Sequence, residues 1–328
     1  MIISRTPVRL ALAGGGTDLP AYYTQHGASL VTAAIDKYVY VFVKRRFNRD
    51  IRVSYSKTEI VGSPEEIQHP VVREALKLLR IDGGIEIVSV ADVPANAGLG
   101  TSSSFAVGLL HALHAFKGEH PTAKALAQEA YTIERVILAE PGGLQDQYVA
   151  AYGGLIALDI DTQGEVTVTP LPMENRWLAE LESRLLFFDT QLTRTACEIQ
   201  AEHVRAMVSG AGEVIESLHT IKRLGLETRE ALERADLDQF GRLLNEHWLH
   251  KKRVGRNISN GDIDRWYALA MEAGALGGKL IGAGGGGFLM FCAGQEHRDQ
   301  VRNALSREGL GEVRFRFEPS GSRILLNL

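Results

Sequence analysis

Glycines and hydroxyl side chains are concentrated in the segment PANAGLGTSSS, residues 94–104. Gly98 and Gly100 directly precede Thr101 and three serines, and an apolar stretch with helical spacing follows. A helix N-terminus presents unpaired N–H groups and a partial positive charge, and glycines let the backbone approach an anion closely. The pattern predicts a phosphate-binding loop, although a serine-capped core helix after a tight turn has the same composition. No lysine follows the second glycine, so the loop is not a P-loop.

Two carboxylates lie further along the chain. Glu134 is in the segment EAYTIERVIL, which has helical spacing, and Asp146 follows the turn residues Pro141, Gly142 and Gly143. From the residues alone, a helical glutamate is usually on a solvated face, and Asp146 is typical of a helix N-cap. The spacing therefore predicts a glutamate on a helix and an aspartate in the loop that follows it.

The chain contains 34 glycines, where an average composition would give roughly 23. Further clusters lie at 14–16, 142–143 and 282–287, each against a strand or helix pattern. This placement favours ligand-contacting loops over flexible linkers or tight turns. The last cluster also matches the dinucleotide fingerprint G-x-G-x-x-G, but we expect a helix before it and a strand after it. Because the fingerprint requires the reverse order, a Rossmann site is not predicted.

Mixed strand and helix patterns must position these loops. Strands are expected at 2–13, 29–34, 38–46, 51–55, 85–90, 154–160, 184–189, 287–292 and 313–317. Helices are expected at 70–79, 102–116, 122–138, 194–225, 228–236, 238–253 and 262–275. Because the two types do not alternate regularly, the sequence favours an α+β fold with two lobes over a doubly wound sheet.

Composition and charge exclude several classes of protein. The net charge of −4 argues against a nucleic-acid partner. No apolar stretch reaches about 18 residues, so no membrane span or membrane partner is expected, and the N-terminus lacks the pattern of an export signal. Cys197 and Cys292 match no metal or redox spacing, so we expect a reducing, cytoplasmic location. Two histidine pairs without a third ligand are expected to be packing or surface residues: His111 with His114, and His247 with His250.

Three segments resemble the signatures of the GHMP kinases, the superfamily of galactokinase, homoserine kinase, mevalonate kinase and phosphomevalonate kinase. Their order along the chain and their spacing also match those of the family. The loop at 94–104 is similar to the second signature, with Thr101 in place of a serine and Ser103 in place of an alanine. RTPVRLALAGGGTDLPAYY at 5–23 resembles the N-terminal signature of the sugar-1-kinase branch, and GGKLIGAGGGGFLMF at 277–291 resembles the C-terminal one.

The resemblance implies a two-lobed α+β fold. Its N-terminal lobe would be similar to ribosomal protein S5 domain 2, and its C-terminal lobe would be ferredoxin-like. The implied domains are residues 1–170 and 171–328, with nucleotide and sugar bound between the lobes.

The resemblance also implies roles for individual residues. Asp146 matches the catalytic aspartate, and Arg9 matches the arginine that assists it or stabilises the transferring phosphoryl group. Mg²⁺ would be held by Ser102 and Glu134. ATP would be bound by Pro94, Gly98, Leu99, Gly100, Thr101, Ser102 and Ser103. The sugar would be bound by Gly15, Gly16, Thr17, Asp18, Gly143, Arg194, Gly284 and Gly285.

The implied function is that of an ATP-dependent sugar 1-kinase. The form AGGGTDLP followed by Tyr-Tyr is similar to bacterial heptose 7-phosphate kinases. This implies phosphorylation of the anomeric hydroxyl of D-glycero-D-manno-heptose 7-phosphate to the 1,7-bisphosphate, for nucleotide-activated heptose synthesis. The alternatives are a kinase of fucose or a hexose derivative, and a non-catalytic sensor of sugar and ATP.

Two properties are not indicated by the sequence. The oligomeric state has no signature in the chain. The cation that would hold a substrate phosphate is open between Arg194 and the run Lys44–Arg46, although such a run on a strand is also typical of a solvated edge.

Overall fold

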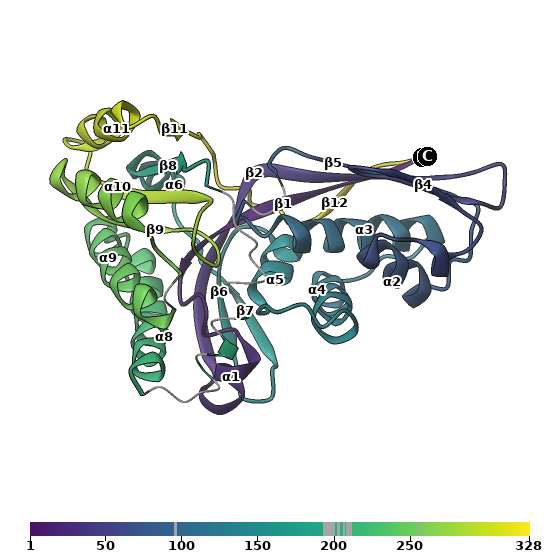
Figure 1. The fold of residues 1–328 in the computed structure, drawn as a ribbon, viewed down its shortest axis with the longest axis horizontal. Helices are drawn as coiled ribbons and strands as arrows, with labels where there is room; N and C mark the ends of the chain where they lie inside the picture. Colours follow the sequence, from purple (N-terminus) through teal and green to yellow (C-terminus); the bar gives the residue numbers. More distant parts are fainter. Residues whose placement is uncertain (95–96, 193–200, 202–203, 206, 208–211, 256) are drawn as a thin grey trace.

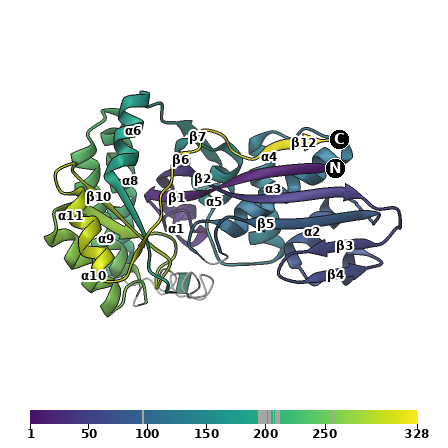
Figure 2. The ribbon, with the colours of Figure 1, turned by 90° about the horizontal axis from the view of Figure 1, so that it is seen from above.

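The structure is a computed structural model that describes residues 1–94, 97–192, 201, 204–205, 207, 212–255 and 257–328. In this part of the chain, one sheet of eight strands and one of four strands are covered by helices (Figure 1 and Figure 2). This arrangement confirms the expected α+β fold with two lobes. None of the described helices is both long and apolar enough to cross a membrane.

Two long antiparallel strands form the centre of the larger sheet, β1 (Ile2–Ala13) and β2 (Ala28–Arg45). The first eight residues of β2 are all buried, because helices cover both faces of the sheet there. The strand order is β12–β1–β2–β5–β3–β4, and β6 pairs with both β2 and β7. The other strands are β3 (Ile51–Ser54), β4 (Thr58–Val61), β5 (Ile85–Ala91), β6 (Leu155–Ile160), β7 (Val166–Pro170) and β12 (Arg323–Asn327).

Four helices cover one face of this sheet, α2 (Pro70–Leu78), α3 (Thr101–Lys117), α4 (Ala123–Tyr131) and α5 (Gln145–Tyr152) (Figure 1). The central helix α3 is buried around most of its circumference, because it packs against β1 and β2 and also against α4 and α5. Arg9 N donates to Leu99 O at 3.0 Å. The loop that precedes α3 is therefore held against β1.

The smaller sheet is antiparallel, with the order β11–β8–β10–β9. Its strands are β8 (Leu185–Asp189), β9 (Ala275–Leu280), β10 (Phe288–Ala293) and β11 (Gly311–Glu312). The helices of this lobe are α6 (Asn175–Arg184), α8 (Gly212–Glu233), α9 (Leu237–Val254), α10 (Gly261–Glu272) and α11 (Arg298–Arg307).

Helix α8 joins the two lobes, because it packs on α9 and also on β1 and β2. A Cβ at Gly225 of α8 would lie 2.3 Å from Ser29 O of β2. After β11 the chain returns to the larger sheet, where β12 pairs with β1. The domain division at residue 170 stays a prediction, and this last strand lies on the sheet of the first lobe.

Several expected elements differ from the structure. The strands expected at 29–34 and 38–46 form one continuous strand, β2, and α8 runs without a break through residues 226–227, where two helices were expected. Of the expected helix 194–225, residues 194–200, 202–203, 206 and 208–211 lie outside the described residues. At 313–317 an isolated bridge between Ile35 and Phe317 replaces the expected strand. The segment before the glycines at 282–287 is a strand, β9, rather than a helix, because pairing with β10 outweighs its helix-favouring residues. No helix follows these glycines, so the absence of a dinucleotide fold still holds.

Candidate active site

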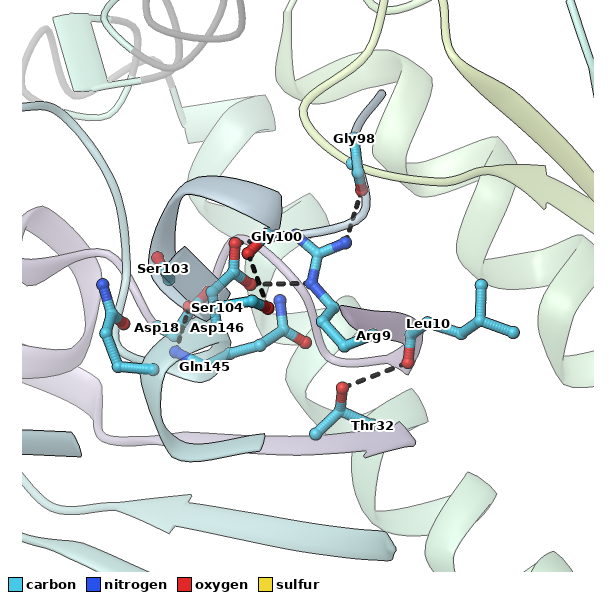
Figure 3. Close-up of polar contacts among 12 residues, drawn as sticks. Arg9, Leu10, Asp18, Thr32, Gly98, Gly100, Ser103, Ser104, Gln145 and Asp146 are labelled. Atoms are coloured by element: carbon cyan, nitrogen blue, oxygen red, sulfur yellow. Dashed lines mark hydrogen bonds and ion pairs between the residues drawn. The ribbon is translucent and has the colours of Figure 1, made fainter. Parts of the chain in front are cut away.

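Arg9 and Asp146 form an ion pair where β1 meets the loop before α3. Arg9 Nε donates to Asp146 Oδ1 at 2.7 Å and Arg9 Nη2 donates to Oδ2 at 2.9 Å (Figure 3). Arg9 Nη1 donates to Gly98 O at 2.5 Å. This bidentate geometry fixes the orientation of the carboxylate, which lies in the first turn of α5. The structure brings together the two residues that are predicted to be catalytic.

Asp18 lies near this pair, in the turn before α1 (Pro20–His26). Gly16 N donates to Asp18 Oδ1 at 3.1 Å, and Gln145 N donates to Oδ2 at 3.2 Å. Burial raises the pKa of Asp18, the charge of Asp146 raises it further, and the backbone N–H groups lower it. The two carboxylates therefore have different surroundings: Asp146 faces a guanidinium, whereas Asp18 is held by backbone amides.

Two glycines provide the space that these carboxylates occupy. A Cβ at Gly143 would lie 1.9 Å from Asp18 Oδ2, and a Cβ at Gly100 would lie 3.2 Å from Asp146 Oδ2. Gly100 also has a φ of 73°, in the left-handed region that favours glycine. A side chain at position 143 would displace Asp18.

The N-terminus of α3 faces the same region. Its first turn contains no acidic residue, and the preceding Gly98 and Gly100 both have positive φ. Thr101 Oγ1 is buried and has no hydrogen-bond partner among the described residues. In the same loop Leu99 is buried, and Pro94 is exposed. A long helix with a free positive end and an unsatisfied hydroxyl fits a phosphate group.

Glu134 is fully buried beside the start of α3. Ser102 Oγ donates to Glu134 Oε1 at 2.8 Å, Ser103 Oγ donates to Oε2 at 2.8 Å, and Gln147 Nε2 donates to Oε2 at 2.6 Å. The segment Thr132–Ile137 is a π-helix that directly follows α4, where a single helix over 122–138 was expected. A serine hydroxyl and a carboxylate in contact are hard oxygen ligands, and Mg²⁺ usually takes one or two of these from protein. The predicted metal ligands therefore fit the ion.

One pocket is lined by Arg9, Asp18 and Asp146 and has two walls from different lobes. The first lobe contributes Arg9, Asp18 and Asp146, which we call the catalytic wall, together with Gly15, Gly16 and Gly143. The second lobe contributes His247, Lys251 and Lys279, which we call the basic wall, together with Leu218, Ile221, Val254, Ile258, Gly282 and Ala283.

The basic wall was not predicted from the sequence. His247 is buried on α9, as expected of a packing residue, and it also lines the pocket. His247 and Lys251 are on α9, and Lys279 is on β9. Lys251 Nζ donates to Leu280 O at 3.0 Å and to Gly282 O at 2.6 Å. A Cβ at Gly282 would lie 2.6 Å from Gly98 Cα, so the glycine loop of the second lobe contacts the loop before α3.

A second pocket lies on the other side of the start of α3. Thr101 and Ser102 line it, together with apolar and aromatic side chains from β2, β5, α2 and α3. The remaining lining residues are Val39, Tyr55, Ser56, His69, Val71, Ser89, Val90, Ala91 and Phe105. An apolar pocket with a few polar groups beside an anion site suits a flat aromatic base.

Among the predicted sugar ligands, some do not line the first pocket. Thr17 supports the turn instead, because its Oγ1 donates to Gly14 O at 2.7 Å. Gly284 and Gly285 are buried beside Ile258, and Gly285 N donates to Ile258 O at 3.0 Å. Sugar contacts by these three residues stay predictions.

Neither of the two sequence candidates for holding a substrate phosphate is found in the pocket of Asp146 among the described residues. Arg194 lies outside the described residues. Lys44 and Arg45 are exposed at the end of β2, and Lys44 and Arg46 form ion pairs with Glu86 at 3.2 and 3.6 Å. None of the three residues of this run lines the pocket of Asp146.

Comparison with known proteins places the chain among the GHMP kinases. Residues 70–154 match the N-terminal domain of GHMP kinases, and residues 228–310 match their C-terminal domain. The chain is 33% identical to D-glycero-alpha-D-manno-heptose 7-phosphate kinase of Campylobacter jejuni, over 94% of both chains. It is 30% identical to L-fucokinase/L-fucose-1-P guanylyltransferase of Bacteroides fragilis, over 89% of this chain and 34% of that protein.

Solved structures agree with this placement. A D-glycero-D-manno-heptose 1-phosphate kinase from Bacteroides thetaiotaomicron is 28% identical, with a TM-score of 0.82 and coverage of 99% of both chains. Lactococcus lactis galactokinase, complexed with galactose, shares the fold with a TM-score of 0.79 at 17% identity, over 99% of this chain and 95% of that one. The chain belongs to the GHMP kinase family and is a phosphotransferase that uses ATP and a hydroxyl acceptor.

Proposed function

We propose that the protein phosphorylates the anomeric hydroxyl of D-glycero-D-manno-heptose 7-phosphate, and that the 1,7-bisphosphate formed serves nucleotide-activated heptose synthesis. The observation that carries the proposal is the Arg9–Asp146 pair, at 2.7 and 2.9 Å, which lines the pocket between the two lobes and lies beside Gly100 at the N-terminus of α3. The heptose as acceptor is supported by the relative with 33% identity over 94% of both chains.

In the proposed reaction, Asp146 accepts a hydrogen bond from the anomeric hydroxyl and receives its proton. The hydroxyl oxygen forms a bond to the γ-phosphorus of ATP as the bond to the β,γ-bridging oxygen breaks, and ADP leaves with that electron pair. Arg9 orients Asp146 through its Nε and Nη2, and its positive charge stabilises the negative charge on the moving phosphoryl group. An anomeric hydroxyl is more acidic than an ordinary alcohol, so positioning supplies much of the activation.

The ATP phosphates are proposed to bind at Gly98, Gly100 and the N–H groups at the start of α3. The unsatisfied Thr101 Oγ1 would then have an acceptor. The base would occupy the second pocket, which Thr101 and Ser102 also line. Pro94, Leu99 and Ser103 complete the proposed ATP site as parts of the same loop.

Ser102 and Glu134 would hold Mg²⁺. When bound, the ion would neutralise charge on the ATP phosphates and orient the γ-phosphoryl group. The hydrogen bonds from Ser103 and Gln147 to Glu134 would hold this carboxylate in a fixed orientation toward Ser102.

The sugar is proposed to bind between Asp18 and the glycines that line the pocket. The Asp18 carboxylate would accept hydrogen bonds from ring hydroxyls. Gly15, Gly16 and Gly143 would allow the ring to approach the backbone, because a side chain at these positions would occupy part of the pocket wall. Arg194 is retained as a proposed sugar contact, as are Thr17, Gly284 and Gly285.

L-Fucose is the second candidate acceptor, because the matching part of the Bacteroides fragilis fucokinase is 30% identical. A coupled ADP-release assay over free and phosphorylated sugars distinguishes the two. We expect kcat/KM for heptose 7-phosphate to exceed that for L-fucose, mannose and hexose 6-phosphates by about 100-fold, with ³¹P NMR showing an anomeric phosphate. Equal or higher activity with fucose would overturn the heptose assignment. If no sugar in the panel supports ATP turnover, the kinase proposal falls and the non-catalytic sensor of sugar and ATP is left.

A further inference from the structure

Three basic side chains are buried together in the wall that the second lobe contributes to the pocket. His247 and Lys279 each have 1% of their surface exposed, and Lys251 has 8%. Their neighbours in the pocket lining are mostly aliphatic, including Leu218, Ile221, Val254 and Ile258. Basic groups are rarely buried among aliphatic side chains unless an anion or a hydrogen-bond network compensates them.

Within the described residues, this compensation is incomplete. No carboxylate in the described part of the chain forms an ion pair with Lys251 or Lys279. Lys279 Nζ donates to Leu12 O at 3.4 Å, which leaves donor capacity on an ammonium group that has three N–H bonds. Both ring nitrogens of His247 are buried without a hydrogen-bond partner. Unsatisfied buried donors that line one pocket indicate a ligand with several acceptor oxygens.

The electrostatics of the basic wall agree with this interpretation. Burial lowers the pKa of Lys251 to about 7, and the charge of Arg9 contributes. Burial and the charges of Lys251 and Arg9 lower the pKa of Lys279 well below its usual value, and burial with the two lysines lowers the pKa of His247. An anion in contact with these groups would favour their protonated forms, so binding would be coupled to proton uptake.

We propose that Lys279 and His247, together with Lys251, form the subsite that holds the acceptor's own phosphate monoester. This inference rests on the proposed sugar kinase function and adds the residues that select a phosphorylated acceptor. A phosphate has three terminal oxygens, which match the number of basic groups in the wall.

The position of the subsite suits such an acceptor. Lys279 contacts the backbone of Leu12 on β1, and Arg9 lies three residues earlier on the same strand. At about 3.3 Å per residue, these positions are separated by about 10 Å. A seven-carbon sugar with its anomeric hydroxyl at Asp146 can extend a terminal phosphate over this span.

The basic wall could instead bind the γ-phosphate of ATP, which is also an anion with terminal oxygens. Lys251 is hydrogen-bonded to Gly282 O, and Gly282 contacts Gly98 in the loop before α3. The substitution Lys279→Met distinguishes binding of the acceptor's phosphate from binding of the ATP γ-phosphate, because methionine has a similar length and no charge. The matched control is Lys252→Met, on the same helix as Lys251, where the lysine forms a surface ion pair with Asp264 at 3.0 Å.

We expect Lys279→Met to lower kcat/KM for heptose 7-phosphate at least 30-fold more than kcat/KM for the unphosphorylated heptose, through KM of the sugar. Lys252→Met should leave both values within twofold of wild type. If Lys279→Met lowers both values equally, or instead raises KM for ATP, the subsite does not hold the acceptor phosphate.

Binding measured without ATP gives a second readout. Calorimetry with heptose 7-phosphate at pH 8, in two buffers of different ionisation enthalpy, should show net proton uptake by wild type and less by Lys279→Met. Inorganic phosphate should raise the Tm of wild type more than that of the variant. His247→Gln, which keeps a neutral polar group, provides an independent test should the methionine variant fold poorly. Proton uptake and Tm shifts equal to wild type in both variants would overturn the proposal.

The outcomes also separate this inference from the acceptor assignment. If wild type prefers other sugar phosphates, and Lys279→Met removes that preference, the phosphate subsite stands and the heptose assignment falls. If wild type prefers unphosphorylated sugars, the subsite falls, whereas sugar 1-kinase activity stands.

Discussion

The two walls of the pocket differ in how their charges are balanced. In the catalytic wall, Arg9 donates three hydrogen bonds and Asp146 and Asp18 each accept two. In the basic wall, Lys279 has one long hydrogen bond, and His247 has none among the described residues. Groups that are satisfied within the protein are positioned before substrate arrives, which suits electrostatic stabilisation of a transition state. Groups without a hydrogen-bond partner in the protein gain one only when a ligand with matching acceptors binds, which suits selection between phosphorylated and unphosphorylated acceptors.

The largest effect is expected from Asp146→Asn, which removes the proton acceptor and keeps the shape of the side chain. We expect kcat to fall by about 10³-fold, while the Kd for ATP stays within about threefold, because the Asp146 carboxylate is hydrogen-bonded to Arg9 and does not occupy the N–H groups at the start of α3. Steady-state ADP release and calorimetry with a non-hydrolysable ATP analogue measure the two values. A kcat near that of wild type would remove Asp146 from the mechanism.

The next largest effect is expected from Arg9→Met, which tests whether the catalytic wall depends on its internal balance. This change leaves Asp146 without its cation, so we expect kcat to fall about 100-fold and the free energy of unfolding to fall by about 2 kcal/mol. Arg9→Lys should restore little activity, because lysine cannot form the bidentate pair.

The stability comparison sharpens the difference between the walls. Without ligand, Lys279→Met should keep the Tm of wild type or raise it, because it removes an uncompensated buried amine. Chemical denaturation and calorimetry of both variants measure this difference. A loss of stability in Lys279→Met as large as that in Arg9→Met would show that the charges of both walls are compensated within the protein, which would contradict the difference between them.

A smaller effect is expected from Glu134→Gln on the Mg²⁺ requirement. The amide keeps the size of the side chain, but its single oxygen can replace only one of the two carboxylate oxygens that accept from Ser102 and Ser103, and it lacks the negative charge that attracts the cation. We expect the Mg²⁺ concentration for half-maximal activity to rise roughly 30-fold, with saturating Mg²⁺ restoring much of kcat. An unchanged Mg²⁺ dependence would place the ion elsewhere.

The smallest effect is expected from pH. Burial lowers the pKa of Lys251 to about 7 and lowers the pKa of Lys279 well below its usual value, so these lysines lose protons in the free enzyme at lower pH than ordinary lysines do. The KM for heptose 7-phosphate should therefore rise roughly tenfold between pH 7 and pH 8, while the KM for unphosphorylated heptose changes little. The other charged groups of the pocket are Arg9, Asp18 and Asp146. Equal pH dependence for both sugars would show that the effect does not arise from contacts with the acceptor's phosphate.

The lowered pKa values of the two lysines also determine how the free energy of unfolding changes with pH. A lysine whose pKa is lowered in the folded state binds fewer protons there than in the unfolded chain. Its contribution to the free energy of unfolding therefore rises between the folded pKa, about 7 for Lys251, and the unfolded value near 10.4. The variant Lys279→Met should show a smaller rise over this window.

The residues of the catalytic wall could be located from the sequence because short motifs carry them. The glycines, hydroxyls and aspartates of 5–23, 94–104 and 141–146 are adjacent in the chain, and each local pattern predicts its own loop. Their mutual contacts could not be predicted, since the Arg9–Asp146 pair joins residues that are 137 positions apart.

The basic wall could not be located because its residues resemble ordinary surface lysines and histidines. One signal was present on α9. Phe240, Leu244, Trp248 and Lys251 share a buried stripe at helical spacing, and His247 lies within it. On β9, Lys279 is the one charged residue in a strand that is otherwise apolar. Charged or polar residues at core positions of a periodic pattern are the feature to search for.

Element boundaries were least predictable where tertiary contacts decide them. Asp36 and Lys37 suggest a break between two strands, and they lie at a register shift where Pro7 pairs with Tyr38 and Val8 pairs with Ile35. Pairing with β1 on both sides of this irregularity keeps β2 continuous. Several short elements, including α1, β4, β7 and β12, carry too few residues for a periodic pattern. The π-helical turn at Glu134 has no sequence signature of its own.

The return of β12 to β1 has a consequence for the second lobe as a folding unit. The chain leaves the larger sheet after β7, builds the smaller sheet and its helices, and then adds a strand beside the first one. The second lobe is thus an insertion within the first. Removing the chain from the second lobe onward would also remove β12 and expose the edge of β1 in the larger sheet. We therefore expect the two lobes to unfold in a single thermal transition.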